Sequence, residues 1–363
     1  MTKLGVLFSV LGVGAGCIPA FAQKQLPNII VMLSDDQGWG DLGFTGNTFV
    51  QTPNIDRIAH EGTILENFYV CPVSSPTRAE FLTGRYHVRS GVNSTTGGGE
   101  RFNLGEKTIA EYFREAGYAT SLFGKWHSGT QYPYHPNARG FEEFYGFCSG
   151  HWGNYWNPVL EHNGEIISGE GFIIDDLTDK ALDYIRDHKE HPFFMFLSYN
   201  TPHSPMQVPD SWWNRVKDRT LSQRATFPEQ EDTTFTKAAL ALAENLDWNI
   251  GRVLSLLHSL DLEQETIVIY FSDNGPNSFR WNGGMKGRKG STDEGGVRSP
   301  FCIRWPGHIR KGAVETQLSG AIDLIPTLLG LAGIEYTPLR KLDGIDWGQR
   351  LLDEKAPAID RVL

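Results

Sequence analysis

Four short apolar segments, each followed directly by polar residues, constrain the fold of this chain more than any other feature. They occupy residues 28–34, 119–124, 193–199 and 266–272. Each is apolar at successive positions, which is typical of parallel strands that helices cover on both faces. Helical patterns lie between them, at residues 103–116, 175–189 and 237–260. Strands that alternate with helices predict a doubly wound α/β domain with a mostly parallel sheet.

The polar residues after these strands predict one shared site. Asp35 and Asp36 follow the first strand, and Asp273 and Asn274 follow the fourth. Ligands of open α/β sheets bind outside the carboxyl ends of the strands, so these side chains should converge. A single Asp pair is more often a turn or a helix cap. Two such pairs at two strand ends favour a metal site, and their oxygen ligands suit calcium or magnesium better than zinc.

The segment Ser74-Ser75-Pro76-Thr77-Arg78 predicts a helix start, with Ser75 as the N-cap and Pro76 at the first helical position. The Ser74 hydroxyl would then lie at the positive end of a helix dipole, with Arg78 about one turn away, which favours an anion. The net charge is −10 at pH 7. That charge excludes a basic surface for nucleic acid, so an anionic substrate must meet a few local cations.

Ser74-x-Pro76-x-Arg78, followed by Leu82-Thr83-Gly84-Arg85, resembles the signature of type I sulfatases, which belong to the alkaline-phosphatase superfamily. Further segments match that family in the same order. They are residues 52–56, 124–127, 139–141, 201–203, 272–275, 289–298 and 323–326. An ordered set of this kind is far more specific than one motif.

The resemblance implies a nucleophile and a metal. Ser74 would be oxidised after synthesis to formylglycine (3-oxoalanine) by a maturase that accepts serine. Calcium, in preference to magnesium, would be held by the four strand-end residues Asp35, Asp36, Asp273 and Asn274.

The resemblance also implies roles for the cationic residues. Arg78, Lys125 and Lys289 would neutralise the sulfate oxygens and orient the nucleophile. His203 would protonate the leaving alcohol, and His127 would assist the later breakdown of the enzyme sulfate ester. Lys289 is preferred to Lys286 because its spacing to Glu294-Gly295-Gly296 matches that of the family.

The substrate predicted in this way is a sulfated carbohydrate or an aryl sulfate. Trp152 and Trp156 lie between the family motifs, where their rings would stack on sugars or, equally, belong to the core or a lid. Two other functions stay open. One is a phosphodiesterase or phosphonate hydrolase of the same superfamily, and the other is a silent binder of sulfated glycans whose Ser74 is unmodified.

The ends of the chain predict export and a second, shorter region. Residues 1–22 resemble a bacterial signal peptide that is cleaved after Ala22, which indicates a periplasmic or extracellular protein. A lipoprotein anchored through Cys17 is the weaker alternative, because Gly14 stands where a large aliphatic residue is usual. No later segment is apolar enough to form a transmembrane helix.

We expect a catalytic domain at residues 23–345 and, at residues 346–363, the start of a truncated C-terminal region that lacks the usual small antiparallel subdomain. Three cysteines lie beyond the predicted signal peptide: Cys71, Cys148 and Cys302. Their spacing indicates neither a disulfide framework nor a zinc site. Cys71 is interpreted as a small packed residue.

Overall fold

The computed structural model describes residues 1–2 and 26–363. The predicted signal peptide therefore lies outside the described residues from residue 3 onward, and Cys17 lies outside them too. Within the described part of the chain, no helix combines the length and the apolar character needed to cross a bilayer.

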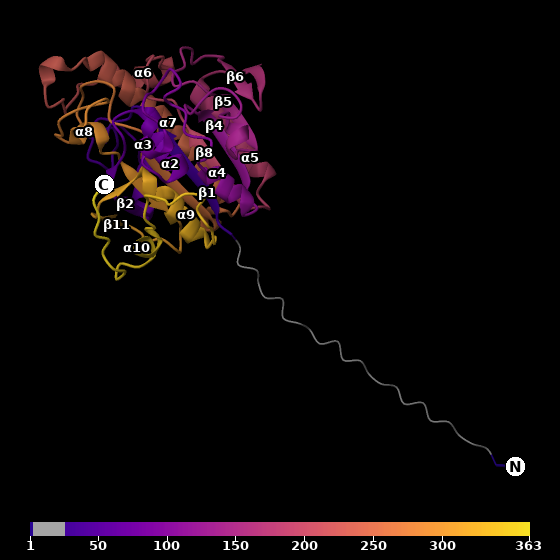
Figure 1. Ribbon diagram of the computed structural model, residues 1–363. Helices are drawn as coiled ribbons and strands as arrows, with labels where there is room; N and C mark the ends of the chain where they lie inside the picture. The colour runs from indigo at the N-terminus through magenta and orange to yellow at the C-terminus, as the bar shows by residue number, and fades with distance from the viewer. Residues whose placement is uncertain (3–25) are drawn as a thin grey trace.

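A sheet of ten strands forms the centre of the fold, in the order β11-β2-β10-β9-β1-β8-β4-β5-β6-β7 (Figure 1). Its middle consists of the four predicted strands: β9 (Thr266–Ser272), β1 (Asn28–Ser34), β8 (Phe193–Ser198) and β4 (Ala119–Lys125). Neighbours among these four pair in parallel. The predicted α/β class and the mostly parallel sheet are confirmed.

Shorter strands extend the sheet on both sides. β5 (Glu143–Phe147) continues it in parallel, whereas β6 (Val159–His162), β7 (Glu165–Ser168) and β10 (Phe301–Arg304) pair antiparallel. β2 (Thr63–Leu65) and β11 (Ala313–Glu315) complete the sheet beyond β10. β3 (Phe68–Tyr69) pairs separately with β12 (Ser319–Gly320).

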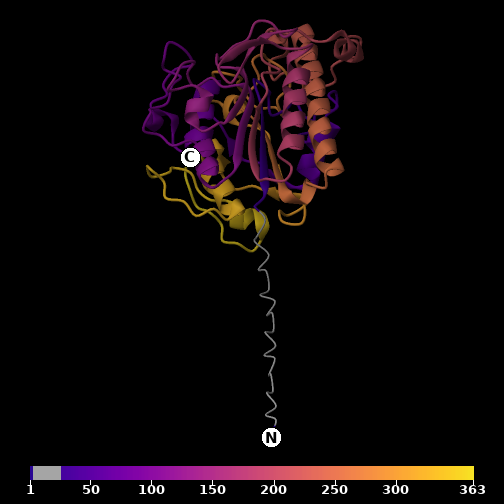
Figure 2. The same ribbon diagram turned by 90° about the vertical axis from the view of Figure 1, so that its right-hand side faces the viewer.

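Helices cover both faces of the sheet, as Figure 2 shows from the side. One layer contains α1 (Pro53–Glu61), α5 (Ile173–Asp187) and α7 (Thr233–Ser259), and the other contains α2 (Ser74–Thr83), α4 (Ile109–Glu115) and α9 (Leu324–Ala332). Short helices lie outside these layers: α3 (His87–Ser90), α6 (Asp210–Val216), α8 (Glu294–Val297) and α10 (Gly348–Leu352). The 3₁₀ turns are η1 (Pro136–Arg139), η2 (Pro228–Gln230), η3 (Glu263–Glu265) and η4 (Ala321–Asp323).

Strand β1 shows why the predicted strands are apolar at successive positions. Ile29, Val31 and Leu33 pack into the core beneath α2, α4 and α9. Ile30 and Met32 pack into the core beneath α1, α5 and α7. Because alternate side chains point to opposite faces, a strand between two helical layers needs apolar residues at every position.

The predicted helix starts differ from the observed ones. The helices predicted from residues 175 and 237 begin earlier, at Ile173 and Thr233. Two other starts are wrong for reasons that the structure shows. The helix predicted from residue 103 begins only at Ile109, because Thr108 and Glu111 form a capping box that fixes the start there. Helix α2 begins at Ser74 with Val73 as its N-cap, so Ser75 is not the cap and Pro76 is not the first helical residue. The Ser75 hydroxyl instead donates to the Glu100 carbonyl at 3.4 Å.

The last residues pack onto the main domain. Trp347 is 1% exposed, and its indole Nε1 donates to Asp323 Oδ2 at 3.2 Å. Leu351 belongs to the same core as α2 and α9. The predicted boundary at residue 345 and the truncation of residues 346–363 stay predictions.

Candidate active site

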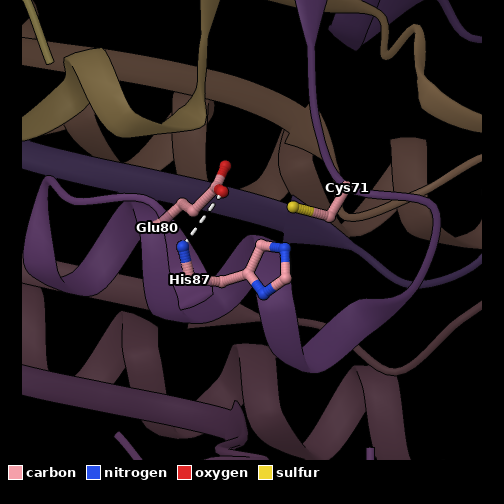
Figure 3. Close-up of side chains that lie close together, drawn as sticks. All are labelled: Cys71, Glu80 and His87. Carbon is pink, nitrogen blue, oxygen red and sulfur yellow. Dashed lines mark hydrogen bonds between the residues drawn. The ribbon is translucent and has the colours of Figure 1, made fainter. Parts of the chain in front are cut away.

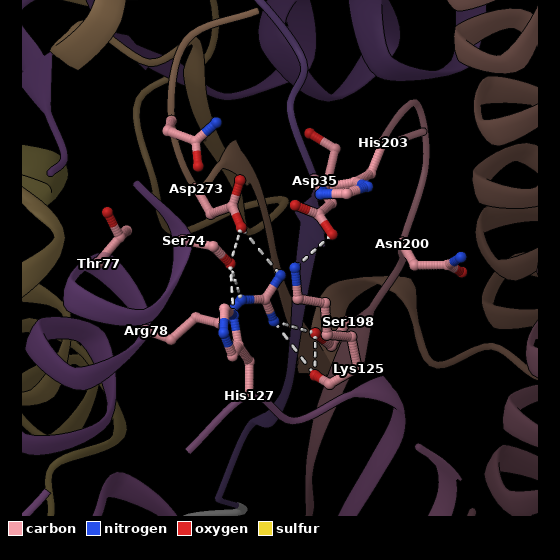
Figure 4. A network of polar contacts seen from close by, with 12 residues as sticks. Asp35, Ser74, Thr77, Arg78, Lys125, His127, Ser198, Asn200, His203 and Asp273 are labelled. Carbon is pink, nitrogen blue, oxygen red and sulfur yellow. Dashed lines mark hydrogen bonds and ion pairs between the residues drawn. The ribbon is translucent and has the colours of Figure 1, made fainter. Parts of the chain in front are cut away.

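The carboxyl ends of the central strands and the start of α2 meet at one pocket of about 420 Å³. Five predicted site residues line it, namely Ser74, Lys125, His127, His203 and Lys289. Five others lie directly behind or beside these walls, in a single polar network whose centre Figure 4 shows: Arg78, Asp35, Asp36, Asp273 and Asn274. The sheet topology thus brings together residues that are up to 254 positions apart in sequence, as from Asp35 to Lys289.

Ser74 stands at the centre of this network as the first residue of α2. Its hydroxyl donates to Asp273 Oδ2 at 2.6 Å and accepts from Arg78 Nε at 2.9 Å. His127 Nδ1 lies 3.2 Å from the same oxygen. Three groups of different sequence origin therefore surround one buried side-chain oxygen (Figure 4).

Arg78 is fully buried, and every nitrogen of its guanidinium has a partner. Nη2 pairs with Asp273 Oδ2 at 3.1 Å, and Nη1 donates to Ser198 Oγ at 2.6 Å and to the Lys125 carbonyl at 3.1 Å. These contacts fix the plane of the guanidinium beside Ser74. Ser198, the last residue of β8, was not predicted, although a polar residue at a buried strand end is the signal that marks it.

His127 is held as a neutral base. Its Nε2 lies 2.8 Å from the Thr95 carbonyl, so Nε2 carries the proton and the Nδ1 lone pair faces Ser74. Burial, reinforced by the nearby Lys125 ammonium, lowers the pKa of His127 to about 3. Gly150 leaves room for the ring, because a Cβ there would lie 2.2 Å from His127 Nε2.

The carboxylates are paired with the lysines. Lys125 Nζ lies 2.6 Å from Asp35 Oδ2, and Lys289 Nζ lies 2.6 Å from Asp36 Oδ1. Burial by itself would raise the pKa of Asp35, but Lys125, His203, Arg78 and Lys289 together outweigh it and hold that pKa well below the usual range. Burial, together with the charge of Asp35, raises the pKa of Asp273.

Three oxygens of the predicted metal ligands are buried without any hydrogen-bond partner among the described residues. They are Asp35 Oδ1, Asp36 Oδ2 and Asn274 Oδ1. An unpaired buried oxygen costs about 1–3 kcal/mol, more if charged. Asp36 also has a left-handed backbone, with φ of 64°, a strain that functional sites often contain. The three unpaired oxygens are hard ligands, and together with the strained backbone of Asp36 they fit a divalent cation such as calcium or magnesium.

His203 lies at the wall of the pocket. Its Nε2 is 3.5 Å from Asp36 Oδ2, and its Nδ1 is 2.6 Å from the Ser204 carbonyl. The ring of His151, another lining residue, lies 5.3 Å away. A proton on His203 Nε2 would therefore face the pocket and the carboxylate together.

The remaining predicted residues lie in three different settings. Lys286 is exposed and pairs with Asp293, so it does not share the position of Lys289 beside Asp36. Trp152 stacks on Phe147 with ring centroids 5.0 Å apart, and Trp156 is 47% exposed. Neither tryptophan lines the pocket, and their predicted contact with sugar stays a prediction.

Some pocket residues carried no signal in the sequence. Thr95, Thr96, Ser149 and His151 line the pocket from loops, where no periodic pattern marks them. Asn200 is buried after β8, and neither atom of its side-chain amide has a partner in the described structure. Its place after a strand was visible, but its unpaired amide was not.

Residues 27–334 match the sulfatase family. The chain belongs to this family. Sulfatases hydrolyse sulfate esters, and the family and superfamily inferred from the Ser74 signature are confirmed.

Relatives of known identity cover most of this sulfatase. N-acetylgalactosamine-6-sulfatase of Sus scrofa is 32% identical over 377 residues, which is 94% of this chain and 68% of that protein. The crystal structure of Ps i-CgsB in complex with k-i-k-neocarrahexaose superposes with a TM-score of 0.79 at 32% identity, over 89% of this chain and 75% of that one. The phosphonate monoester hydrolase of Agrobacterium radiobacter shares the fold, with a TM-score of 0.69 at 20% identity over 91% and 78%.

Proposed function

We propose that this sulfatase hydrolyses sulfate esters of carbohydrates, with a formylglycine made from Ser74 and with bound calcium. One observation carries the proposal. Asp273 Oδ2 and the Nδ1 lone pair of His127 both face the Ser74 oxygen as acceptors, at 2.6 and 3.2 Å. A serine hydroxyl has a single proton and can donate to only one of them. The hydrate of an aldehyde has two hydroxyls on one carbon, which is one donor for each acceptor.

The two hydroxyls would supply the chemistry: one would attack sulfur and displace the alcohol as the ester sulfur–oxygen bond breaks, and the second would lose its proton to re-form the aldehyde as the carbon–oxygen bond breaks and sulfate leaves. Asp273 is placed to accept the proton of the first hydroxyl, and neutral His127 is placed to accept that of the second. Arg78 Nε donates to the Ser74 oxygen at 2.9 Å and so would keep the nucleophile in position. An ordinary serine would lack the second hydroxyl, so sulfate transferred to it would stay bound.

His203 is the proposed acid for the leaving alcohol. It lines the pocket and is 14% exposed, so it is accessible to a bound ester. A sugar alkoxide is a poor leaving group, and a proton donated as the sulfur–oxygen bond breaks lowers the barrier. Lys125 and Lys289, on the walls of the same pocket, would hold the sulfate oxygens.

The charges of the site explain how an acidic protein binds an anion. Three carboxylates face three cations, so these residues alone leave no surplus of positive charge. The carboxylates are those of Asp35, Asp36 and Asp273, and the cations are Arg78, Lys125 and Lys289. Calcium on Asp35, Asp36, Asp273 and Asn274 would supply that surplus, two positive charges, to stabilise the sulfate ester and the charge that develops on it. Calcium is preferred to magnesium because four protein ligands suit its higher coordination number.

The carbohydrate part of the proposal rests on relatives and on the walls of the pocket. One relative is named for N-acetylgalactosamine, and one structural neighbour was solved with a neocarrahexaose. The pocket walls add hydroxyl and imidazole groups from Thr95, Thr96, Ser149 and His151, which suit the hydroxyls of a sugar. An aryl sulfate would find few apolar side chains there.

Mass spectrometry tests the nucleophile directly. Trypsin releases residue 74 in the peptide Ile58–Arg78. In active protein we expect this peptide to be about 2 Da lighter than its sequence mass, because oxidation removes two hydrogens, and to react with aldehyde reagents. Protein made without a maturase that accepts serine should keep the unmodified mass and be inactive. Ser74→Cys should recover activity in a host that modifies cysteine-type sulfatases. Full turnover by protein with plain serine at position 74 would refute the mechanism.

Paired substrates separate the two other functions. A phosphonate or phosphodiester hydrolase would turn over an aryl phosphoester faster than the matched aryl sulfate, and we expect the reverse order. A silent glycan binder would hold a sulfated oligosaccharide without releasing sulfate even when residue 74 carries the aldehyde.

We also propose that the protein is exported, on the pattern of residues 1–22 alone. N-terminal sequencing of protein from a bacterial host should find Gln23 as the first residue. A lipid on Cys17 would instead indicate the lipoprotein alternative.

A further inference from the structure

Behind the nucleophile, and apart from the predicted calcium ligands, lies a cluster of metal-ligating side chains formed by Cys71, Glu80 and His87 (Figure 3). Cys71 precedes α2, Glu80 belongs to α2, and His87 is the first residue of α3. One ligand atom from each lies within 4.8 Å of the other two. We propose that these three residues bind a zinc ion, at a site separate from the calcium site.

Glu80 provides the first argument. Its side chain is buried, with the residue 7% exposed, and no lysine or arginine of the described chain forms an ion pair with it. Its partners are the backbone N–H of His87, at 3.2 Å, and the Cys71 thiol. Buried carboxylates are normally paired with a cation or coordinate a metal. A bound cation would neutralise this one.

His87 provides the second argument. Its Nδ1 lies 2.8 Å from the Val92 carbonyl, so Nδ1 carries the proton and donates it. Nε2 is then left with a free lone pair, and Figure 3 shows that this nitrogen lies on the side of the Cys71 thiol. Metal-binding histidines commonly donate their other ring nitrogen to a carbonyl in this way, which fixes both the tautomer and the ring.

A second cluster with the same residue types shows the opposite arrangement. His135, Cys148 and Glu161 also lie within 4.8 Å of one another. There, however, His135 Nδ1 accepts the backbone N–H of Asn137 at 3.3 Å, so Nε2 carries the proton and donates it to Glu161 Oε1 at 2.5 Å. That histidine has no lone pair left for a metal. Of these two cysteine-containing clusters, the Cys71 cluster is the one whose histidine has the tautomer that a metal needs.

The ligand types indicate zinc. A thiolate, an imidazole and a carboxylate are each zinc ligands, whereas calcium prefers oxygen ligands alone. Tetrahedral zinc places such donors roughly 3.3 to 3.5 Å apart, which small side-chain movements reach from the present positions. His87 is partly exposed, so water can supply the fourth ligand.

Such an ion would support the nucleophile from behind. Cys71 is tied to the first turn of α2, because its backbone N–H donates to Thr77 Oγ1 at 2.9 Å. Zinc on Cys71, Glu80 and His87 would join this loop to the end of α2 and to α3. Burial, together with Glu80, raises the pKa of the Cys71 thiol, so zinc binding should release a proton.

Cobalt titration tests the proposal, because cobalt(II) replaces zinc and reports thiolate ligands through a charge-transfer band. The full chain is first saturated with calcium, so that the oxygen site is occupied. We expect one equivalent of cobalt to produce the band and one equivalent of zinc to remove it. Cys71→Ser should abolish the band, and His87→Gln should weaken binding by about 10-fold or more. Cys148→Ser, the matched control, should leave the band unchanged.

Two results would overturn the proposal: binding without a thiolate band, or a band that survives Cys71→Ser. If Cys71→Ser does not fold, the wild-type protein still decides the matter. Zinc should then slow alkylation of Cys71 and leave that of Cys148 unchanged, as read by peptide mass spectrometry. Equal alkylation of Cys71 with and without zinc would exclude the site.

Discussion

The two ends of the sheet each have a pocket, and the larger one is lined by none of the predicted site residues. The pocket at the carboxyl ends has a volume of about 420 Å³, whereas the one near the amino ends of β4 and β5 has about 660 Å³. The larger pocket is lined by five carboxylates, namely Glu142, Glu143, Glu170, Asp183 and Asp187, and by only one lysine, Lys180. A sulfate ester would be repelled there.

The two pockets differ in how well their polar groups are satisfied. At the amino end, Glu143 accepts from His162 and Asn163, and these groups are partly exposed to water. At the carboxyl end, one oxygen each of Asp35, Asp36 and Asn274 is buried without a hydrogen-bond partner among the described residues, and Asp36 and His127 have positive φ angles. Convergent charge, unpaired oxygens and strain mark the functional end, and volume does not.

The largest effect should come from Asp273, which contacts Ser74, Arg78 and the backbone of Asp36. Asp273→Asn should lower kcat/KM by about 1000-fold or more, because it removes a negative charge from the proposed metal site and replaces the carboxylate that would accept the proton of the nucleophile. Activity on a sulfated sugar and the calcium content measured by atomic absorption both test this. A variant with normal calcium content and normal turnover would contradict the assigned site.

The next effect should depend on the leaving group. His203→Ala should slow a sugar sulfate by about 100- to 10000-fold but nitrophenyl sulfate much less, because nitrophenolate leaves without a proton. Steady-state rates on both substrates provide the test. Equal losses would show that His203 is not the acid.

Two lysines in one loop offer a matched pair. Lys289→Met should lower kcat/KM by about 100-fold, since this ammonium faces the pocket beside Asp36. Lys286→Met should change it by no more than about 2-fold, because its side chain is 70% exposed and pairs with Asp293. Reversed effects would mean that the motif spacing identified the wrong lysine.

The smallest effect should come from the acidic pocket. The double variant Glu142→Gln with Glu143→Gln should change kcat/KM by less than about 2-fold, because nothing links these side chains to Ser74. The same sulfated sugar serves as substrate. A loss of 10-fold or more would show that the two ends of the sheet are coupled.

Much of the fold could be predicted because the central strands have a strong local signal. A strand that is buried on both faces must be apolar at every position. Ile30 packs into the core on one face of the sheet and Val31 into the core on the other. The short strands β6, β7 and β10, which lie outside the central four, were not predicted, since strands of four residues have too few positions for a pattern. The start of α2 was misjudged because Thr77, rather than Ser75, ties the preceding loop to the helix.

The sequence by itself determined the chemical inventory of this protein: the order of the motifs, the hard oxygens after two strands, and the serine at the start of a helix. Only the tertiary structure decided how those groups are used. The Thr95 carbonyl makes His127 a neutral acceptor beside Ser74, and the Val92 carbonyl leaves Nε2 of His87 free. A histidine's tautomer depends on a carbonyl that the folded chain brings to one ring nitrogen, and no local sequence pattern shows which carbonyl that will be.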